Sequence, residues 1–129
     1  MQINQLAKQA DVPAKTIRYY EDIGLLNPPV RAANGYRQYK SDDVHRLVFI
    51  RRCRDLQISL DDIRQMLAVQ ADNSAPCAQV DQIIQQQLTR VQVARQELEK
   101  LEHSLTALAN SCKRNRIDEC GILHRLTEE

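Results

Sequence analysis

Glycine and long apolar segments are scarce in this chain. Its 129 residues include only three glycines, and no apolar run reaches the length of about 18 residues that a membrane-spanning helix needs. The first residues, MQINQLAKQADVP, are polar and periodic, unlike a secretory signal peptide. The sequence contains neither a nucleophile–base motif nor a phosphate-binding loop. We therefore expect a cytoplasmic protein that is not an enzyme and has no membrane partner.

Cysteine occurs at four positions. Structural disulfides are rare in the cytoplasm, where paired cysteines are more often metal ligands or redox groups. Cys53 falls within an amphipathic segment and is expected to be a buried small apolar side chain. Cys77, Cys112 and Cys120 remain as candidates for a functional site.

The net charge of +1 hides an uneven distribution. Residues 1–58 carry ten Lys and Arg against six Asp and Glu, about +4, whereas residues 59–129 carry eight against eleven, about −3. A basic first half suits a polyanionic partner such as nucleic acid.

Two short helices joined by a tight turn are predicted at the start of the chain. Apolar residues recur at helical spacing from Ile3 to Ala10, and the Asp11–Pro13 segment then interrupts the pattern. Pro13 is expected to be the first residue of a second helix, which Gly24 ends. This arrangement predicts a helix-turn-helix.

A two-stranded wing is predicted next. The Asn34–Gly35 pair is a strong hairpin signal because both residues tolerate positive φ. Two further helices should follow, one capped by Ser41 and reaching about Leu56, the other capped by Ser59.

A long helix is predicted from about Val80 to Cys112. Its apolar positions follow a heptad pattern with one polar member, which indicates a coiled coil and hence a homodimer. These seam positions are Val80, Ile84, Gln87, Val91, Ala94, Leu98, Leu101, Leu105, Leu108 and Cys112.

The three candidate cysteines lie at opposite ends of this helix. A continuous helix of this length spans about 50 Å, so Cys77 and Cys112 of one chain cannot bind the same ion. In an antiparallel dimer, Cys77 of one subunit would meet Cys112 and Cys120 of the other, twice by symmetry. Three thiolates suit a soft cation, with water or His124 as a fourth ligand for zinc. A thiol-redox sensor using a Cys112–Cys120 disulfide is the alternative.

A DNA interface is predicted on the second helix and the wing. In a helix-turn-helix the second helix presents side chains to the major groove, and arginine and tyrosine also contact phosphates. The candidates are Lys15, Thr16, Arg18 and Tyr19 on the helix, with Arg31, Tyr36 and Arg37 on the wing.

The segments INQLAKQADVPAKTIRYYEDIGLL and GYRQYKSDDVHRLVFIRRCRDLQISLDDIRQML, taken with the cysteines, resemble the MerR family of bacterial metal-responsive transcription regulators. The resemblance covers essentially the whole chain. It implies a mainly α fold, with a winged helix-turn-helix DNA-binding domain and a long antiparallel coiled-coil dimerisation helix. It also implies that the metal-bound homodimer distorts an overlong promoter spacer, so that RNA polymerase can engage the promoter DNA.

The cysteine set is similar to that of one branch of the family. Members that sense monovalent metals typically carry serine at the position of Cys77, whereas the three-cysteine set resembles cadmium- and lead-responsive members. Cd(II) or Pb(II) is therefore the expected inducer, with Zn(II) or Hg(II) as the alternative. We expect a DNA-binding domain at 1–70, a linker at 71–79, a dimerisation helix at 80–112, and a metal-binding loop with a short helix at 113–129.

Overall fold

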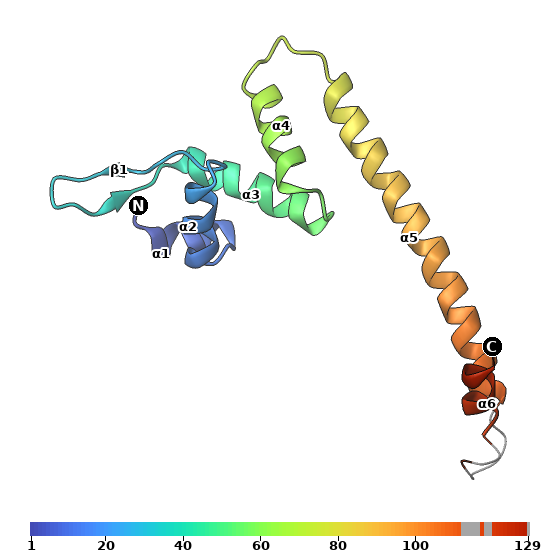
Figure 1. Cartoon of the computed structure of the whole chain (residues 1–129). Helices are drawn as coiled ribbons and strands as arrows, with labels where there is room; N and C mark the ends of the chain where they lie inside the picture. The colour runs from blue at the N-terminus through green and yellow to red at the C-terminus, as the bar shows by residue number, and fades with distance from the viewer. Residues whose placement is uncertain (112–116, 118–119, 129) are drawn as a thin grey trace. The chain divides into compact units, whose positions relative to one another are not determined.

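The computed structural model describes residues 1–111, 117 and 120–128, and it is mainly helical (Figure 1). The chain divides into two compact units, Met1–Val80 and Asp81–Glu129. The helices and strands of the first unit are α1 (Ile3–Ala10), α2 (Ala14–Asp22), β1 (Val30–Arg31), β2 (Arg37–Gln38), α3 (Ser41–Asp55) and α4 (Leu60–Gln70). Helix α5 (Ala78–Ser111) begins in the first unit and continues into the second, which also holds α6 (Gly121–Thr127).

The helix-turn-helix is formed by α1 and α2, as expected. Helix α1 ends because Asp11 adopts a left-handed conformation with φ 55°. The expectation that Pro13 is the first residue of α2 is wrong by one position. Pro13 has an extended ψ of 145° and is the N-cap, and its carbonyl accepts the amide of Ile17 at 3.0 Å. After α2, Gly24 turns the chain with φ 80°, a conformation that costs glycine little.

The wing is a short antiparallel hairpin that extends away from the helices of its unit (Figure 1). Val30 pairs with Gln38, and Arg31 pairs with Arg37. At the tip, the Gly35 amide donates to the Ala32 carbonyl at 2.9 Å, and Gly35 has φ 85°. The Asn34–Gly35 signal therefore identified the place of the turn, although Gly35 has positive φ and Asn34 does not.

The two helices after the wing begin in different ways. The N-cap of α3 is Lys40, so the expected Ser41 cap is wrong. The carboxylate of Asp43 accepts the Lys40 amide at 2.8 Å, which leaves Ser41 as the first helical residue. The N-cap of α4 is Ser59, as expected, and its hydroxyl accepts the Asp62 amide at 3.1 Å.

This difference predicts the effects of two matched substitutions. Ser59→Ala should lower the free energy of unfolding by about 1 kcal/mol, because the Asp62 amide loses its cap. Ser41→Ala should change it by less than about 0.5 kcal/mol. Urea unfolding of both variants measures the difference, and equal effects would contradict the cap assignment.

The core of the first unit is apolar and draws on α1, α2, α3 and α4. Helix α1 packs on α2 and α3, and α3 packs on α4. Large side chains that are essentially inaccessible to solvent hold these elements together. They are Leu6, Ile17, Leu25, Leu26, Leu47, Ile50, Ile58 and Ile63.

In the second unit, α6 lies beside the end of α5 (Figure 1). The guanidinium of Arg125 donates to the Ala107 carbonyl at 3.3 Å. A Cβ atom on Gly121 would lie 2.2 Å from the Ser111 carbonyl oxygen, so this close approach requires glycine. Among the described residues, no helix combines the length and hydropathy needed to cross a membrane.

Candidate functional site

Helix α2 separates a buried face from an exposed polar face. Ile17 and Tyr20 point into the core, and burial is the main reason that the pKa of Tyr20 is raised. Lys15, Arg18 and Tyr19 are exposed on the opposite face. Thr16, the fourth predicted contact on this helix, is partly exposed. The face that the sequence predicts for DNA contact is therefore open to solvent.

The tip of the wing carries two of the predicted contact residues. Arg31 donates to the Gly35 carbonyl at 3.3 Å, which directs its guanidinium across the turn. The Tyr36 amide donates to the Asn34 side chain at 3.1 Å, and the ring of Tyr36 is 61% exposed. Both side chains are thus accessible to a partner.

Arg37 has an internal partner that the sequence did not suggest. Its guanidinium forms an ion pair with Glu21 of α2 at 3.0 Å, and the Glu21 side chain is only 9% exposed. The hydroxyl of Tyr39 donates to the other oxygen of the same carboxylate. Burial, followed by this hydrogen bond, raises the pKa of Tyr39 to about 12. The three side chains fasten the wing to α2, the second helix of the helix-turn-helix.

Three arginines donate to backbone carbonyls of the first unit. Arg46 of α3 donates to Leu25 at 2.7 Å, and Arg64 of α4 donates to Ile23 at 2.5 Å. Arg54 donates to Ile58 at 2.7 Å. Arg46 and Arg54 belong to the ten cationic residues counted over 1–58, so that count overstates the number of side chains that are free to contact nucleic acid. No local sequence signal could have identified the contacts of Arg46 and Arg64. Arg46 lies 21 positions from its partner in the sequence, and Arg64 lies 41 positions from its partner.

The candidate metal ligands lie next to the two ends of α5. Cys77 is exposed and directly precedes the helix, and Cys120 is partly buried at the start of α6. Cys112 lies outside the described residues. With 34 residues, α5 is about 51 Å long. Within the described part of the chain, no three His, Cys, Asp or Glu side chains come together as a metal-binding group.

Cys53 and His124 are the other cysteine and the histidine whose positions bear on metal binding. Cys53 is buried, as expected, and burial raises the pKa of its thiol. This environment disfavours the thiolate that a metal requires. His124 lies in α6, where its amide donates to the Cys120 carbonyl at 3.1 Å.

Helix α5 leaves its apolar seam open in the single chain. The exposed fractions of Ile84, Val91, Leu98, Leu101 and Leu105 range from 39% to 64%. Leu98, Leu101 and Leu105 line a shallow, mainly apolar hollow together with Glu102, Thr106 and Ala109. An apolar stripe of this length is typical of a surface that another helix covers.

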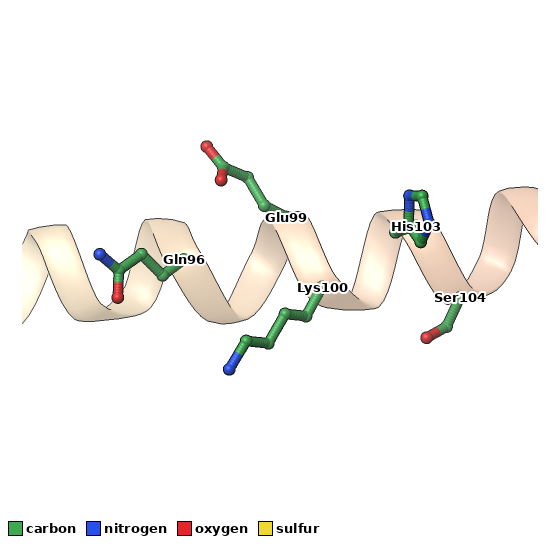
Figure 2. A pocket seen from close by; sticks show the side chains of 5 residues that line it. All are labelled: Gln96, Glu99, Lys100, His103 and Ser104. Carbon is green, nitrogen blue, oxygen red and sulfur yellow. The ribbon is translucent and has the colours of Figure 1, made fainter.

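The other face of α5 is polar. Figure 2 shows a shallow hollow whose lining side chains all extend from this one helix. They are Gln96, Glu99, Lys100, His103 and Ser104. Because the hollow has a single wall, it does not have the enclosed form of a small-molecule site.

Two family models together match most of the chain. A model described as MerR HTH family regulatory protein matches residues 1–70, and a second, described as MerR, DNA binding, matches residues 44–108. The chain is 41% identical over 128 residues to the HTH-type transcriptional regulator HmrR of Rhizobium leguminosarum bv. viciae, covering 99% of this chain and 98% of the relative.

Two solved structures share the fold. The transcription regulator PbrR691 from Ralstonia metallidurans CH34, in complex with lead(II), superposes with a TM-score of 0.89 at 38% identity and covers 98% of this chain and 99% of its own. The dual function regulator MerR from Bacillus megaterium MB1, in complex with mercury(II), has a TM-score of 0.74 at 31% identity. The match covers 99% of this chain and 100% of that structure's chain. The chain belongs to the MerR family of helix-turn-helix, DNA-binding transcriptional regulators, and it is not an enzyme.

Proposed function

We propose that this protein is a homodimeric transcriptional activator that senses a soft divalent metal, with Cd(II) or Pb(II) as its inducer. The observation that carries the proposal is the placement of the candidate thiols around α5. Cys77 precedes the helix and Cys120 follows it, whereas the helix itself is about 51 Å long. One chain cannot bring both thiols to one ion, so a second chain has to supply part of the ligand set.

The seam of α5 supports an antiparallel dimer. Its ten positions are symmetric about residue 96, so Val91 and Leu101 lie five residues on either side. A twofold axis beside residue 96 would place every seam position opposite another one in the partner. In this register the apolar side chains that are exposed in one chain cover those of the other.

The same register accounts for the separated cysteines. Position 77 then lies opposite position 115 of the partner, between Cys112 and Cys120 in the sequence. The proposed ligands are therefore Cys77 from one subunit and Cys112 and Cys120 from the other. Symmetry gives two such sites in a dimer.

The donor set and the relatives support the choice of metal. Thiolates favour soft and borderline cations over hard ones such as Mg(II). The PbrR691 structure, which matches nearly the whole chain, contains lead(II). The mercury(II) complex of a relative at 31% identity favours Hg(II) as the second candidate, followed by Zn(II).

The DNA end of the proposal uses the exposed face of α2 and the wing. Lys15, Thr16, Arg18 and Tyr19 would face the major groove, and the wing residues Arg31, Tyr36 and Arg37 would contact phosphates. Arg37 also donates a hydrogen bond to the Glu21 carboxylate, and a guanidinium has enough N–H groups to bind this carboxylate and a phosphate together.

Metal binding would change promoter geometry through the dimer. A metal that binds one dimer shape more tightly than another shifts the population toward that shape. The preferred shape would distort the promoter, and the binding free energy of the metal would offset the cost of DNA deformation. RNA polymerase in the cytoplasm would then use the distorted promoter. We assign DNA binding to residues 1–70, dimerisation to 80–112 and metal capture to 113–129 together with Cys77.

A panel of metals tests this function. Transcription from the cognate promoter should rise with Cd(II) or Pb(II) at lower concentrations than with Zn(II), and Cu(I) should not induce it. The measurement is transcript yield in a reconstituted system with purified polymerase. Induction by Cu(I) alone, or by no metal, would contradict the proposal.

A further inference from the structure

The C-terminal end of the recognition helix α2 is held by an arginine from α4. The Nη2 atom of Arg64 donates to the Ile23 carbonyl at 2.5 Å. Its Nη1 atom lies 3.3 Å from the position that a Cβ atom on Gly24 would occupy. A cation is favourable there because the last carbonyls of a helix carry partial negative charge. Arg64 thus joins two segments that are 41 residues apart in the sequence.

The residue next to Arg64 contacts the first turn of α5. The Gln79 side-chain amide donates to the Gln65 side-chain oxygen at 3.2 Å. Gln79 is two residues after Cys77, and all of these residues belong to the unit Met1–Val80. Helix α4 therefore touches the recognition helix through Arg64 and the start of α5 through Gln65.

The linker between α4 and α5 is itself ordered by a turn. The Asp72 carboxylate accepts two hydrogen bonds from Ser74, one from its backbone amide at 3.0 Å and one from its side-chain hydroxyl at 2.7 Å. The Ala75 amide donates to the Asp72 carbonyl at 3.1 Å. A displacement of Cys77 would consequently reach α4 through a short, hydrogen-bonded segment as well as through Gln79.

We propose that Arg64 is a positioning residue that carries the state of the metal-binding segment to the recognition helix. The inference rests on the proposed function, because it assumes that Cys77 binds the inducing metal. When Cys77 is drawn to the partner's cysteines, the start of α5 and α4 shift together. Arg64 then moves the C-terminal end of α2 relative to the DNA, which changes how the dimer bends the promoter.

Variants of Arg64 test this role against a matched control. Arg64→Ala removes the hydrogen bond to the Ile23 carbonyl, and Arg64→Lys keeps the charge but lacks the guanidinium that makes this hydrogen bond. Arg52→Ala, at an exposed position on α3, removes the same charge from the same unit. For each variant we would measure Pb(II) affinity by thiolate absorbance, operator affinity without metal, and the ratio of Pb(II)-induced to basal transcription.

Both Arg64 variants should bind Pb(II) like the wild type and keep operator affinity within about threefold. Their induction ratio should fall, by about five- to tenfold for Arg64→Ala, the size expected for an interrupted coupling. An induction ratio equal to that of Arg52→Ala would overturn the inference, and so would a loss of operator affinity as large as the loss of induction. If the wild type itself does not respond to metal, the proposed function is wrong. If the wild type responds and the Arg64 variants respond equally well, only the role of Arg64 is wrong.

Discussion

Replacing Cys77 by serine is expected to abolish metal-induced transcription. A serine hydroxyl is a hard, neutral oxygen and a poor ligand for a soft cation. Even groups that only support a metal ligand cost 10- to 100-fold in affinity when they are removed. Loss of a direct thiolate should therefore lower Cd(II) or Pb(II) affinity by more than about 100-fold. Metal titration and transcription assays measure the two effects.

Cys53 provides the control for this substitution. It is buried in α3, and burial raises the pKa of its thiol. Cys53→Ala should keep the metal affinity of the wild type, with some loss of stability from the small cavity. Operator binding without metal should be the same for Cys77→Ser and the wild type. Full induction in Cys77→Ser would show that the ligand set is wrong.

Replacing Leu101 by glutamate should break the dimer. Leu101 is 55% exposed in the single chain and faces Val91 of the partner in the proposed register. The substitution would bury an unpaired carboxylate, which costs several kcal/mol, and symmetry repeats the cost in each dimer. We expect the dimer dissociation constant to rise by at least about 1000-fold, on the order of 4 kcal/mol. Sedimentation equilibrium measures it.

Gln96→Glu is the matched control for the seam. It adds the same charge to α5 but on the polar face (Figure 2). This variant should remain dimeric and bind the operator, whereas Leu101→Glu should lose both properties at the same concentration. A Leu101→Glu protein that is still dimeric would show that the seam is not the dimer interface.

Local periodicity predicted the helices well because each pattern lies within one element. The heptads from Val80 onward predicted α5, which runs over Ala78–Ser111, and Asn34–Gly35 predicted the turn of the wing. The errors were also local. Pro13 and Ser41 can each occupy either of two adjacent positions at a helix start, and backbone context decides between them.

The contacts that organise the DNA-binding unit were not predictable in the same way. Glu21 accepts hydrogen bonds from Arg37 and Tyr39, and the Ile23 carbonyl accepts one from Arg64. The partners are 16 to 41 positions apart in the sequence. An arginine that binds a helix terminus looks the same in sequence as an arginine that binds phosphate. Only the fold shows which partner is within reach, and it assigns Arg64 to the recognition helix.

The central claim is that each metal ion is held between two subunits, and a mixed dimer tests it most directly. One subunit would carry Cys77→Ser and the other Cys112→Ser with Cys120→Ser. If the ligands come from both subunits, one of the two sites is intact, and the purified heterodimer should bind half as much Pb(II) as the wild type. If all three ligands come from one chain, both sites are damaged, and an absence of tight Pb(II) binding would contradict the account.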